Sequence, residues 1–357
     1  MTRDTEPTPP GRSGQTSLRG VLVCPDHGQP LEHTSQHDPA SGMPFPDGDM
    51  CCPEGCRFRV AGGIPRFIPT EDYAAPFGLQ WRRYRRTQLD SYTGVPLSRV
   101  RLERCLGAPL ESLGDKSVLE VGSGAGRFTE LLIPHCGALV SMDMSSAVEA
   151  NLLNCGEVGA YTLLQGDVRR PPLRKRSFDV VVCLGVIQHT PVPESTIAEL
   201  ASYVKPGGRL VIDHYAYRSQ RFGALLSFFS LHWVLRAIAK RLPAEAGLRF
   251  TNAFTAISDP IRRATSRSPQ LDRLAARVFC SACYYASIPE LPPRICREWN
   301  ELDTHDAMTD WYQHKRKPEE LEACLAGLGF EDIHCEVGAR WGNGIEIRGT
   351  RRAGSDD

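Results

Sequence analysis

Short apolar runs that end at acids or glycines recur through the middle of the chain. Residues 118–121 lead into three glycines, residues 138–142 end at Asp143, and residues 178–184 are apolar apart from Asp179. Continuous apolar runs of this length are typical of strands that are buried on both faces of a parallel sheet. The pattern predicts an open α/β sheet, whose ligands bind at the carboxyl ends of the strands.

The glycines after the first run have the chemistry of a cofactor-binding loop. Gly122, Gly124 and Gly126 let the backbone turn sharply and approach a bound group, and Glu120 lies just before them. Asp143 follows roughly twenty residues later, where a carboxylate meets ribose hydroxyls in dinucleotide-binding sheets. A NAD-binding loop is the structural alternative, but it prefers G-x-G-x-x-G, whereas this loop is G-x-G-x-G.

Three further segments follow the glycine loop in order along the chain. Residues 165–168 place an acid at a strand end, residues 178–184 form an apolar strand, and residues 204–212 form a turn and then a strand. Together the four segments resemble the class I S-adenosylmethionine (SAM)-dependent methyltransferases over about residues 113–217. The resemblance implies an α/β fold with a Rossmann-like methyltransferase sheet, and SAM as the cofactor.

The resemblance also implies roles for individual residues. The loop backbone would cradle the amino acid part of SAM, Asp143 would bind the ribose, and Asp167 with Val168 would contact the adenine. The end of the strand at 178–184 would lie beside the methionine portion and the acceptor. The implied cofactor-binding residues are Glu120, Gly122, Ser123, Gly124, Gly126, Asp143, Met144, Asp167, Val168, Leu184 and Gly185.

Residues 21–69 contain two short-spaced pairs of possible metal ligands, separated by a loop rich in Pro and Gly. This arrangement matches a zinc ribbon, in which four Cys or His side chains enclose one structural zinc ion. So small a unit buries little core, so a metal would supply folding free energy. A metal-free stub is the alternative. The predicted ligands are Cys24, His27, Cys52 and Cys56, with Cys51 as a possible substitute for Cys52.

The end of this unit, residues 63–69, resembles the end of the Trm112-like ribbon that precedes many bacterial methyltransferase domains. The sequence departs from the usual pattern at two ligands. His27 stands where Cys is common, and Cys56 stands where that branch often has His. Both residue types ligate zinc.

The segments around the predicted sheet differ in character. Residues 1–20 are polar and predict a disordered tail. Residues 70–112 predict a helical lead-in, and the part around Trp81 resembles the segment that lies over the SAM pocket. Residues 218–305 form a long insertion with apolar helical patterns, and the resemblance to class I methyltransferases implies that it caps the active site. Residues 306–357 return to the sheet with a helix and a closing antiparallel hairpin.

One apolar run in the insertion raises the question of a membrane segment. Residues 222–239 are mostly apolar, but His232 interrupts the run and Arg236 ends its apolar core. Spanning a bilayer takes roughly twenty apolar residues. We therefore expect a buried cap helix here rather than a membrane contact.

Methyl transfer to a hydroxyl needs an aligned acceptor and a group that removes its proton. Four side chains near the expected strand ends are candidates. His214 directly follows the fifth strand and should face the pocket, so it is the first choice as base or acceptor ligand. His189 is the second, with a structural role near the pocket wall as its alternative. His314 and Tyr312 complete the set.

Composition bounds the remaining possibilities. The chain of 357 residues has 42 basic and 42 acidic side chains, which argues against general nucleic-acid or anionic-membrane binding but leaves room for a local patch. It has 13 cysteines and no stretch of the signal-peptide type, which predicts free or metal-bound thiols in the cytoplasm. No transmembrane segment is expected.

The sequence thus predicts a methyltransferase with a zinc-ribbon-like unit, a helical cap and a small-molecule acceptor, most simply a hydroxyl of a biosynthetic or sugar-containing intermediate. An N-methyltransferase, or a protein or RNA modifier that docks through the ribbon, is the enzymatic alternative. A non-catalytic SAM-binding partner subunit is the alternative of another class.

Overall fold

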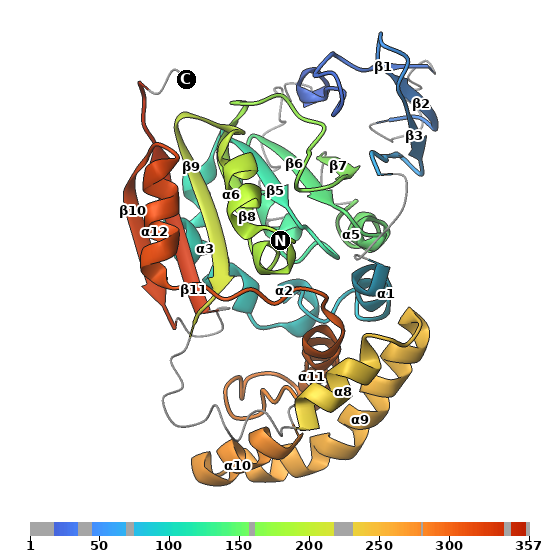
Figure 1. Ribbon diagram of the computed structural model, residues 1–357, viewed down its shortest axis with the longest axis vertical. Coiled ribbons are helices and arrows are strands. Elements are labelled where there is room, and N and C mark those ends of the chain that lie inside the picture. The colour runs from blue at the N-terminus through green and yellow to red at the C-terminus, as the bar shows by residue number, and fades with distance from the viewer. Residues whose placement is uncertain are drawn as a thin grey trace, which may run out of the picture.

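The computed structural model describes residues 18–34, 45–68, 75–156, 161–217, 231–279, 281–338 and 344–354. Its centre is a seven-stranded sheet in the order β10-β11-β9-β8-β5-β6-β7 (Figure 1). Strands β5 to β9 run parallel to their neighbours, whereas β11 pairs antiparallel with both β9 and β10. The strands are β5 (Ser117–Val121), β6 (Ala138–Asp143), β7 (Thr162–Gln165), β8 (Phe178–Cys183), β9 (Val204–Tyr215), β10 (Phe330–Val337) and β11 (Gly344–Arg351). This is a Rossmann-like sheet with an antiparallel closing hairpin, as predicted.

Helices cover both faces of the sheet because alternate strand residues point to opposite sides. Val118 of β5 belongs to one core layer, whereas Leu119 and Val121 belong to the other. The first layer packs against α3 (Leu97–Leu106), η3 (Leu110–Leu113), α4 (Thr129–Leu132) and α5 (Ala147–Cys155). The second packs against η4 (Ile187–His189), α6 (Pro193–Ala201) and α12 (Pro318–Gly327).

The N-terminal unit is a small antiparallel sheet attached to the β7 edge of the large one. It comprises η1 (Leu18–Val21), β1 (Glu32–His33), β2 (Gly48–Cys51), β3 (Arg57–Ala61) and β4 (Ile64–Pro65), with the strands in sequence order. The amide of Phe67 donates to the carbonyl oxygen of Gln165 at 2.7 Å, and the guanidinium of Arg66 donates to the Gln165 side chain. Leu22, Met50 and Val60 join a core layer of the large sheet, so the two sheets share one hydrophobic core.

Helices from the lead-in and the insertion gather at the end of the sheet where β9 finishes (Figure 1). Helix α11 packs against α1, α8 and α9, and α9 packs against α10. The helices are α1 (Ala75–Arg83), α2 (Asp90–Thr93), α8 (Leu231–Ala239), α9 (Ala244–Thr265), α10 (Pro269–Phe279) and α11 (Pro293–Thr309). Among the described residues, none of the helices has the length and apolar character needed to cross a membrane.

The apolar run at residues 222–239 predicted a buried cap helix, and its described part is a helix but not a buried one. Its described part is α8, and residues 222–230 lie outside the described residues. Trp233, Val234 and Ile238 are exposed rather than buried, so the expectation of a buried helix is wrong for these side chains. The period of the apolar residues predicted an amphipathic helix correctly, but it could not say which side would face the protein.

A buried cluster of charges ties the lead-in to the sheet. The guanidinium of Arg101 in α3 forms an ion pair with Asp213 of β9, and its Nε lies 3.7 Å from Glu346 of β11. Arg104 donates two hydrogen bonds of 2.7 Å to the same Glu346 carboxylate. Asp213 in turn accepts the Gly185 amide at 2.6 Å, so the cluster also fixes the turn after β8.

Replacing Arg101 by methionine should lower the free energy of unfolding by about 3–5 kcal/mol, because Asp213 would remain buried without its partner. Arg99→Met, in the same helix, is the matched control. It removes only partly exposed ion pairs and should cost less than about 1 kcal/mol. Urea unfolding followed by circular dichroism measures both, and equally small losses would contradict a structural role for the cluster.

Candidate functional site

A cavity of about 650 Å³ lies between the carboxyl ends of the strands and the helical cap. Its floor comes from the ends of β5, β6, β8 and β9, where Val121, Met142, Leu184 and Tyr215 line it. The lead-in contributes Gln80, Trp81, Gln88, Leu97 and Arg101, and the cap contributes Ala276, Tyr284, Ile288, Trp299, Asp303 and Asp306. Residues of both the lead-in and the cap therefore line the same cavity.

The glycine loop forms one wall of the cavity and requires glycine for steric reasons. Gly122 has φ +77°, and a Cβ added to it would lie 2.0 Å from Cγ2 of Val186. Gly124 has φ +51° and lies against the indole of Trp81. Both conformations are unfavourable for other residues. The glycines thus bring the backbone of the loop to the cavity surface, where its polar groups can meet a ligand.

Asp143 ends β6 beside this loop. One of its carboxylate oxygens accepts the Gly124 amide at 2.8 Å, and the other accepts the amide and hydroxyl of Ser145 at 2.8 and 2.7 Å. Burial raises the pKa of Asp143, and the hydrogen bonds it accepts oppose this shift. Because each carboxylate oxygen has more than one acceptor position, Asp143 can still receive hydroxyl donors from the cavity.

The structure brings most of the implied cofactor-binding residues to the cavity. Those that line it are Gly122, Ser123, Gly124, Asp143, Met144, Val168, Leu184 and Gly185. Gly126, Glu120 and Asp167 do not. Glu120 is buried away from the cavity, where it accepts hydrogen bonds from the hydroxyls of Thr129 and Ser141. Burial raises its pKa to about 7. Asp167 pairs with Arg169 instead.

His214 does not face the cavity, contrary to expectation. Along β9, the neighbours Asp213 and Tyr215 point toward α3 and the cavity, whereas Leu210 and Ile212 point into the opposite core layer. His214 shares the even-numbered face, is fully buried, and does not line the cavity. Burial lowers its pKa to about 4. Strand alternation alone therefore removes the side chain from the pocket.

His189, in contrast, does line the cavity and belongs to a polar chain. Its Nδ1 lies 3.1 Å from the Asp310 carboxylate, and its Nε2 lies 3.3 Å from the hydroxyl of Tyr215. Burial opposes a charge on His189, but Asp310 and Asp306 raise its pKa to about 9. Tyr312 provides only a backbone carbonyl oxygen, 3.0 Å from Nδ1. The side chains of Tyr312 and His314 stack on each other and do not line the cavity.

Several cavity residues have no counterpart in the prediction from sequence. Trp299, Asp303 and Asp306 lie on one face of α11, and burial raises the pKa of both carboxyls. The acid spacing of three residues in a helix was the available signal. Gln188 is fully buried with both amide atoms unpartnered among the described residues, so a polar ligand group could satisfy it.

Arg127 is a second residue that the prediction missed. Its guanidinium donates to Ser98 and Gln88, and it lies 5.4 Å from the Trp299 ring centroid. Burial and the nearby Arg101 lower its pKa to about 10. No carboxylate of the described residues lies within ion-pair distance of it, and it lines the cavity. Because a partly buried cation without a carboxylate partner is costly, the site can accept an anionic group of a ligand.

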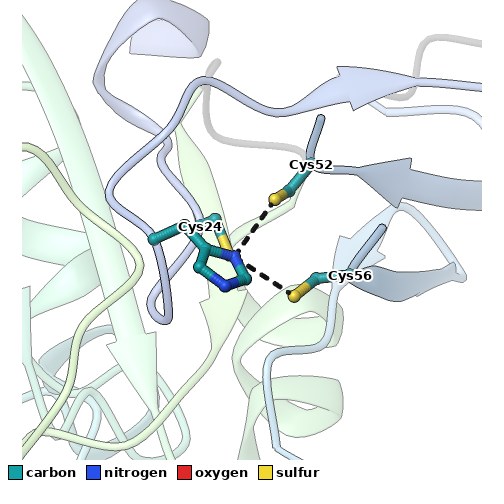
Figure 2. A group of neighbouring side chains, drawn as sticks. Cys24, Cys52 and Cys56 are labelled. Atoms are coloured by element: carbon teal, nitrogen blue, oxygen red, sulfur yellow. Dashed lines mark hydrogen bonds between the residues drawn. The ribbon is translucent and has the colours of Figure 1, made fainter. Parts of the chain in front are cut away.

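The N-terminal unit holds a separate cluster, in which three cysteines surround one imidazole (Figure 2). Nδ1 of His27 lies 3.6, 3.4 and 3.5 Å from the sulfurs of Cys24, Cys52 and Cys56. All four ligand atoms lie within 4.8 Å of one another. The two ligand pairs predicted from spacing are thus brought together, with Cys52 rather than Cys51 as the member.

Comparisons with known proteins match part of this chain. Residues 119–212 match the family described as a methyltransferase domain. A ubiquinone biosynthesis O-methyltransferase of Coxiella burnetii is 31% identical over 108 residues, which is 28% of this chain and 43% of that protein. The enzyme of the same name from Pseudomonas entomophila is 26% identical over 133 residues, 36% of this chain and 56% of that protein. The chain therefore spans about half the length of these curated relatives.

Among solved structures, the magnesium protoporphyrin IX methyltransferase of Synechocystis with bound S-adenosylhomocysteine (SAH) is 16% identical. The match covers 79% of this chain and 97% of that one, with a TM-score of 0.41. The sheet, the glycine loop and the matched segment together identify a class I methyltransferase domain within the chain. The domain occupies the centre of the chain, and the cysteine cluster and the cap lie outside the matched residues.

The environment of His189 predicts an unusual titration. Its pKa should lie near 9 rather than 6.5, because Asp310 and Asp306 stabilise the imidazolium. The resulting stabilisation, about 3 kcal/mol, is fully present below pH 6.5 and is lost as the pH rises through 9. NMR titration measures the pKa of the imidazole, and unfolding at pH 6.5 and at pH 9 measures the change in the free energy of unfolding. In His189→Gln this loss of stability should disappear, and an imidazole pKa near 6.5 in the wild type would contradict the charge assignment.

Proposed function

We propose that this protein is a SAM-dependent methyltransferase that acts on a small-molecule acceptor. The observation that carries the proposal is the single cavity that joins the glycine loop to the cap. Gly122 and Asp143 line its sheet side, and Tyr284 and Trp299 line its cap side. A cofactor on the sheet side would direct its methyl group toward an acceptor under the cap, which is the alignment that in-line displacement requires.

On this proposal, each part of the sheet edge contacts one part of SAM. The loop backbone at Gly122 and Gly124 holds the amino acid portion, and Asp143 accepts hydrogen bonds from the ribose hydroxyls. Val168 borders the adenine, and Leu184 borders the methionine portion. These residues support the assignment because all of them line the cavity. Glu120 acts indirectly, through its buried bonds to Thr129 and Ser141.

We assign the proton-accepting or acceptor-orienting role to His189 in place of His214. His189 lines the cavity, and its contacts with Asp310 and Tyr215 hold the ring in one orientation. With a pKa near 9, the imidazole carries a proton at neutral pH, so its basic form increases as the pH rises. An oxygen acceptor is supported by the names of the two relatives, both O-methyltransferases.

A nitrogen acceptor is the second candidate, and one observation favours it. Asp303 and Asp306 line the cap side of the cavity beside the aromatic rings of Tyr284 and Trp299. Carboxylates and aromatic faces both attract ammonium groups. Release of SAH from SAM in the presence of matched hydroxyl and amine compounds distinguishes the two acceptors. Absence of SAH release with every compound and with cell extract would favour a non-catalytic role.

We propose that the cysteine cluster binds one structural zinc ion in a Trm112-like unit. With zinc bonds of about 2.1 Å to nitrogen and 2.3 Å to sulfur, a tetrahedral site separates these atoms by about 3.6 Å. The three distances from His27 Nδ1, 3.4–3.6 Å, fit that value. The site is closed, so its role is structural.

Asp143→Ala should weaken SAM binding by about 1–3 kcal/mol, because the ribose hydroxyls would lose their acceptor. Asp167→Ala is the matched control and should leave the affinity nearly unchanged, since its carboxylate pairs with Arg169 away from the cavity. Isothermal titration calorimetry with SAM and SAH measures both. Equal affinity of Asp143→Ala and the wild type would contradict the ribose assignment, and binding of NAD instead of SAM would overturn the proposal.

Protein purified without chelator should contain about one zinc per chain by elemental analysis. Cys52→Ser should lose the metal, whereas Cys51→Ser should keep it, because Cys51 is not part of the cluster. Removing zinc should unfold the small sheet and leave SAM binding largely intact. A metal-free wild type with its small sheet folded would show that the cluster packs without an ion.

A further inference from the structure

Helix α9 of the cap turns mostly polar residues toward the protein and apolar residues toward the outside. An ordinary surface helix has the opposite arrangement. The buried face of α9 is mostly polar and carries Gly247, Leu248, Thr251, Thr255, Ser258, Asp259 and Arg262. Thr251 lies 2.9 Å from a ring nitrogen of His305, and Asp259 accepts hydrogen bonds from Asn300 and Tyr285. Hydrogen bonds therefore hold the middle of the helix to the protein, and near its start Leu248 packs in a small apolar cluster with Tyr84 and Leu302.

From Ala253 onward, the outward face of α9 is mostly apolar, with Arg263 as its exposed charge. Its exposed residues recur at helical spacing, so they form one continuous stripe along the helix. The side chain of Ile257 is 70% exposed, which is unusual for so large an apolar group. The stripe consists of Ala253, Ala256, Ile257, Pro260, Ile261 and Ala264.

The two neighbouring helices expose apolar residues at similar spacing. In α10, Leu271, Leu274 and Val278 follow each other at intervals of three and four residues, and Leu274 is 60% exposed. In α8, Trp233, Val234 and Ile238 are exposed. Both helices contact α9. We call these three sets of residues the cap stripes. Such a concentration of large apolar side chains indicates that this part of the cap meets something other than water.

The charge of the same helices is strongly positive, although the whole chain is neutral. Residues 231–279 contain nine Lys and Arg and three Asp and Glu, a net charge of +6. Five of these arginines are exposed, and none of the five forms an ion pair with a carboxylate of the described residues. They are Arg241, Arg249, Arg263, Arg267 and Arg273.

We propose that the cap stripes dock the protein on an anionic lipid surface, with the apolar side chains in the interface and the arginines at the headgroups. Exposed apolar stripes flanked by basic side chains, with an exposed Trp, are the pattern of helices that lie in the plane of a membrane. A second copy of the chain fits less well, because a twofold contact would place the same arginines opposite one another. α10 also lines the cavity, through Ala276, so docking would bring the cap side of the cavity close to the bilayer.

The test is sedimentation of the full-length protein with lipid vesicles, one set of pure phosphatidylcholine and one containing roughly 30% phosphatidylglycerol. The protein should sediment with the anionic vesicles, less with the neutral ones, and less again at high salt. Ile257→Asp combined with Leu274→Asp should weaken binding by at least about tenfold, since both side chains would leave the apolar interface. Arg263→Glu with Arg267→Glu should weaken binding to the anionic vesicles only.

Leu153→Asp is the matched control, because Leu153 of α5 is 73% exposed but lies outside the cap. It should bind vesicles like the wild type. Binding of SAH to every variant verifies that the methyltransferase domain is folded. A wild type that stays in the supernatant with anionic vesicles overturns the proposal. In that case, light scattering distinguishes two other occupants of the cap stripes. A dimer that Ile257→Asp dissociates would identify a second copy of the chain, and a monomer would indicate that another part of the same chain covers the stripes.

Discussion

The buried charge of Arg101 constrains the geometry of the whole cavity. A guanidinium inside a protein needs anionic partners, and its partners here are Asp213 at the end of β9 and Glu346 in β11. Asp213 also holds the Gly185 amide. The position of α3, the ends of two strands and the turn after β8 are therefore set together. Because Arg101 and Gly185 both line the cavity, a change in this cluster would alter the cavity from both its lead-in side and its floor.

The sheet and the loop could be predicted from sequence because their signals are local. An apolar run predicts a strand, the glycines predict the turn after it, and a following acid marks the edge of the sheet where a ligand binds. Gly122, Asp143 and Leu184 line the cavity at this edge. The two metal-ligand pairs were also visible as local spacing. The pairing of these segments in space followed from the resemblance to a known fold, which supplies the strand order that no single segment contains.

The direction in which a side chain of a strand or helix faces was harder to predict. His214 lies one residue from Asp213 and Tyr215, and that single step turns it to the opposite core layer. His189 gains its environment from Asp310, which is more than a hundred residues away in sequence. The cap posed the same difficulty, since the spacing of Ile257 and Ile261 identifies an apolar stripe but not its direction. Only tertiary packing decides these cases.

The attachment of the small N-terminal sheet has a consequence for the behaviour of the protein among its own copies. Strand β7 is the last strand of the large sheet, and an unpaired last strand offers its amides and carbonyls to any strand that approaches. The chain just after β4 occupies that position, through Phe67 and Arg66 at Gln165. The cysteine-bearing unit thus occupies this edge of the sheet at Gln165, and its unfolding would expose backbone groups there to the strands of other copies.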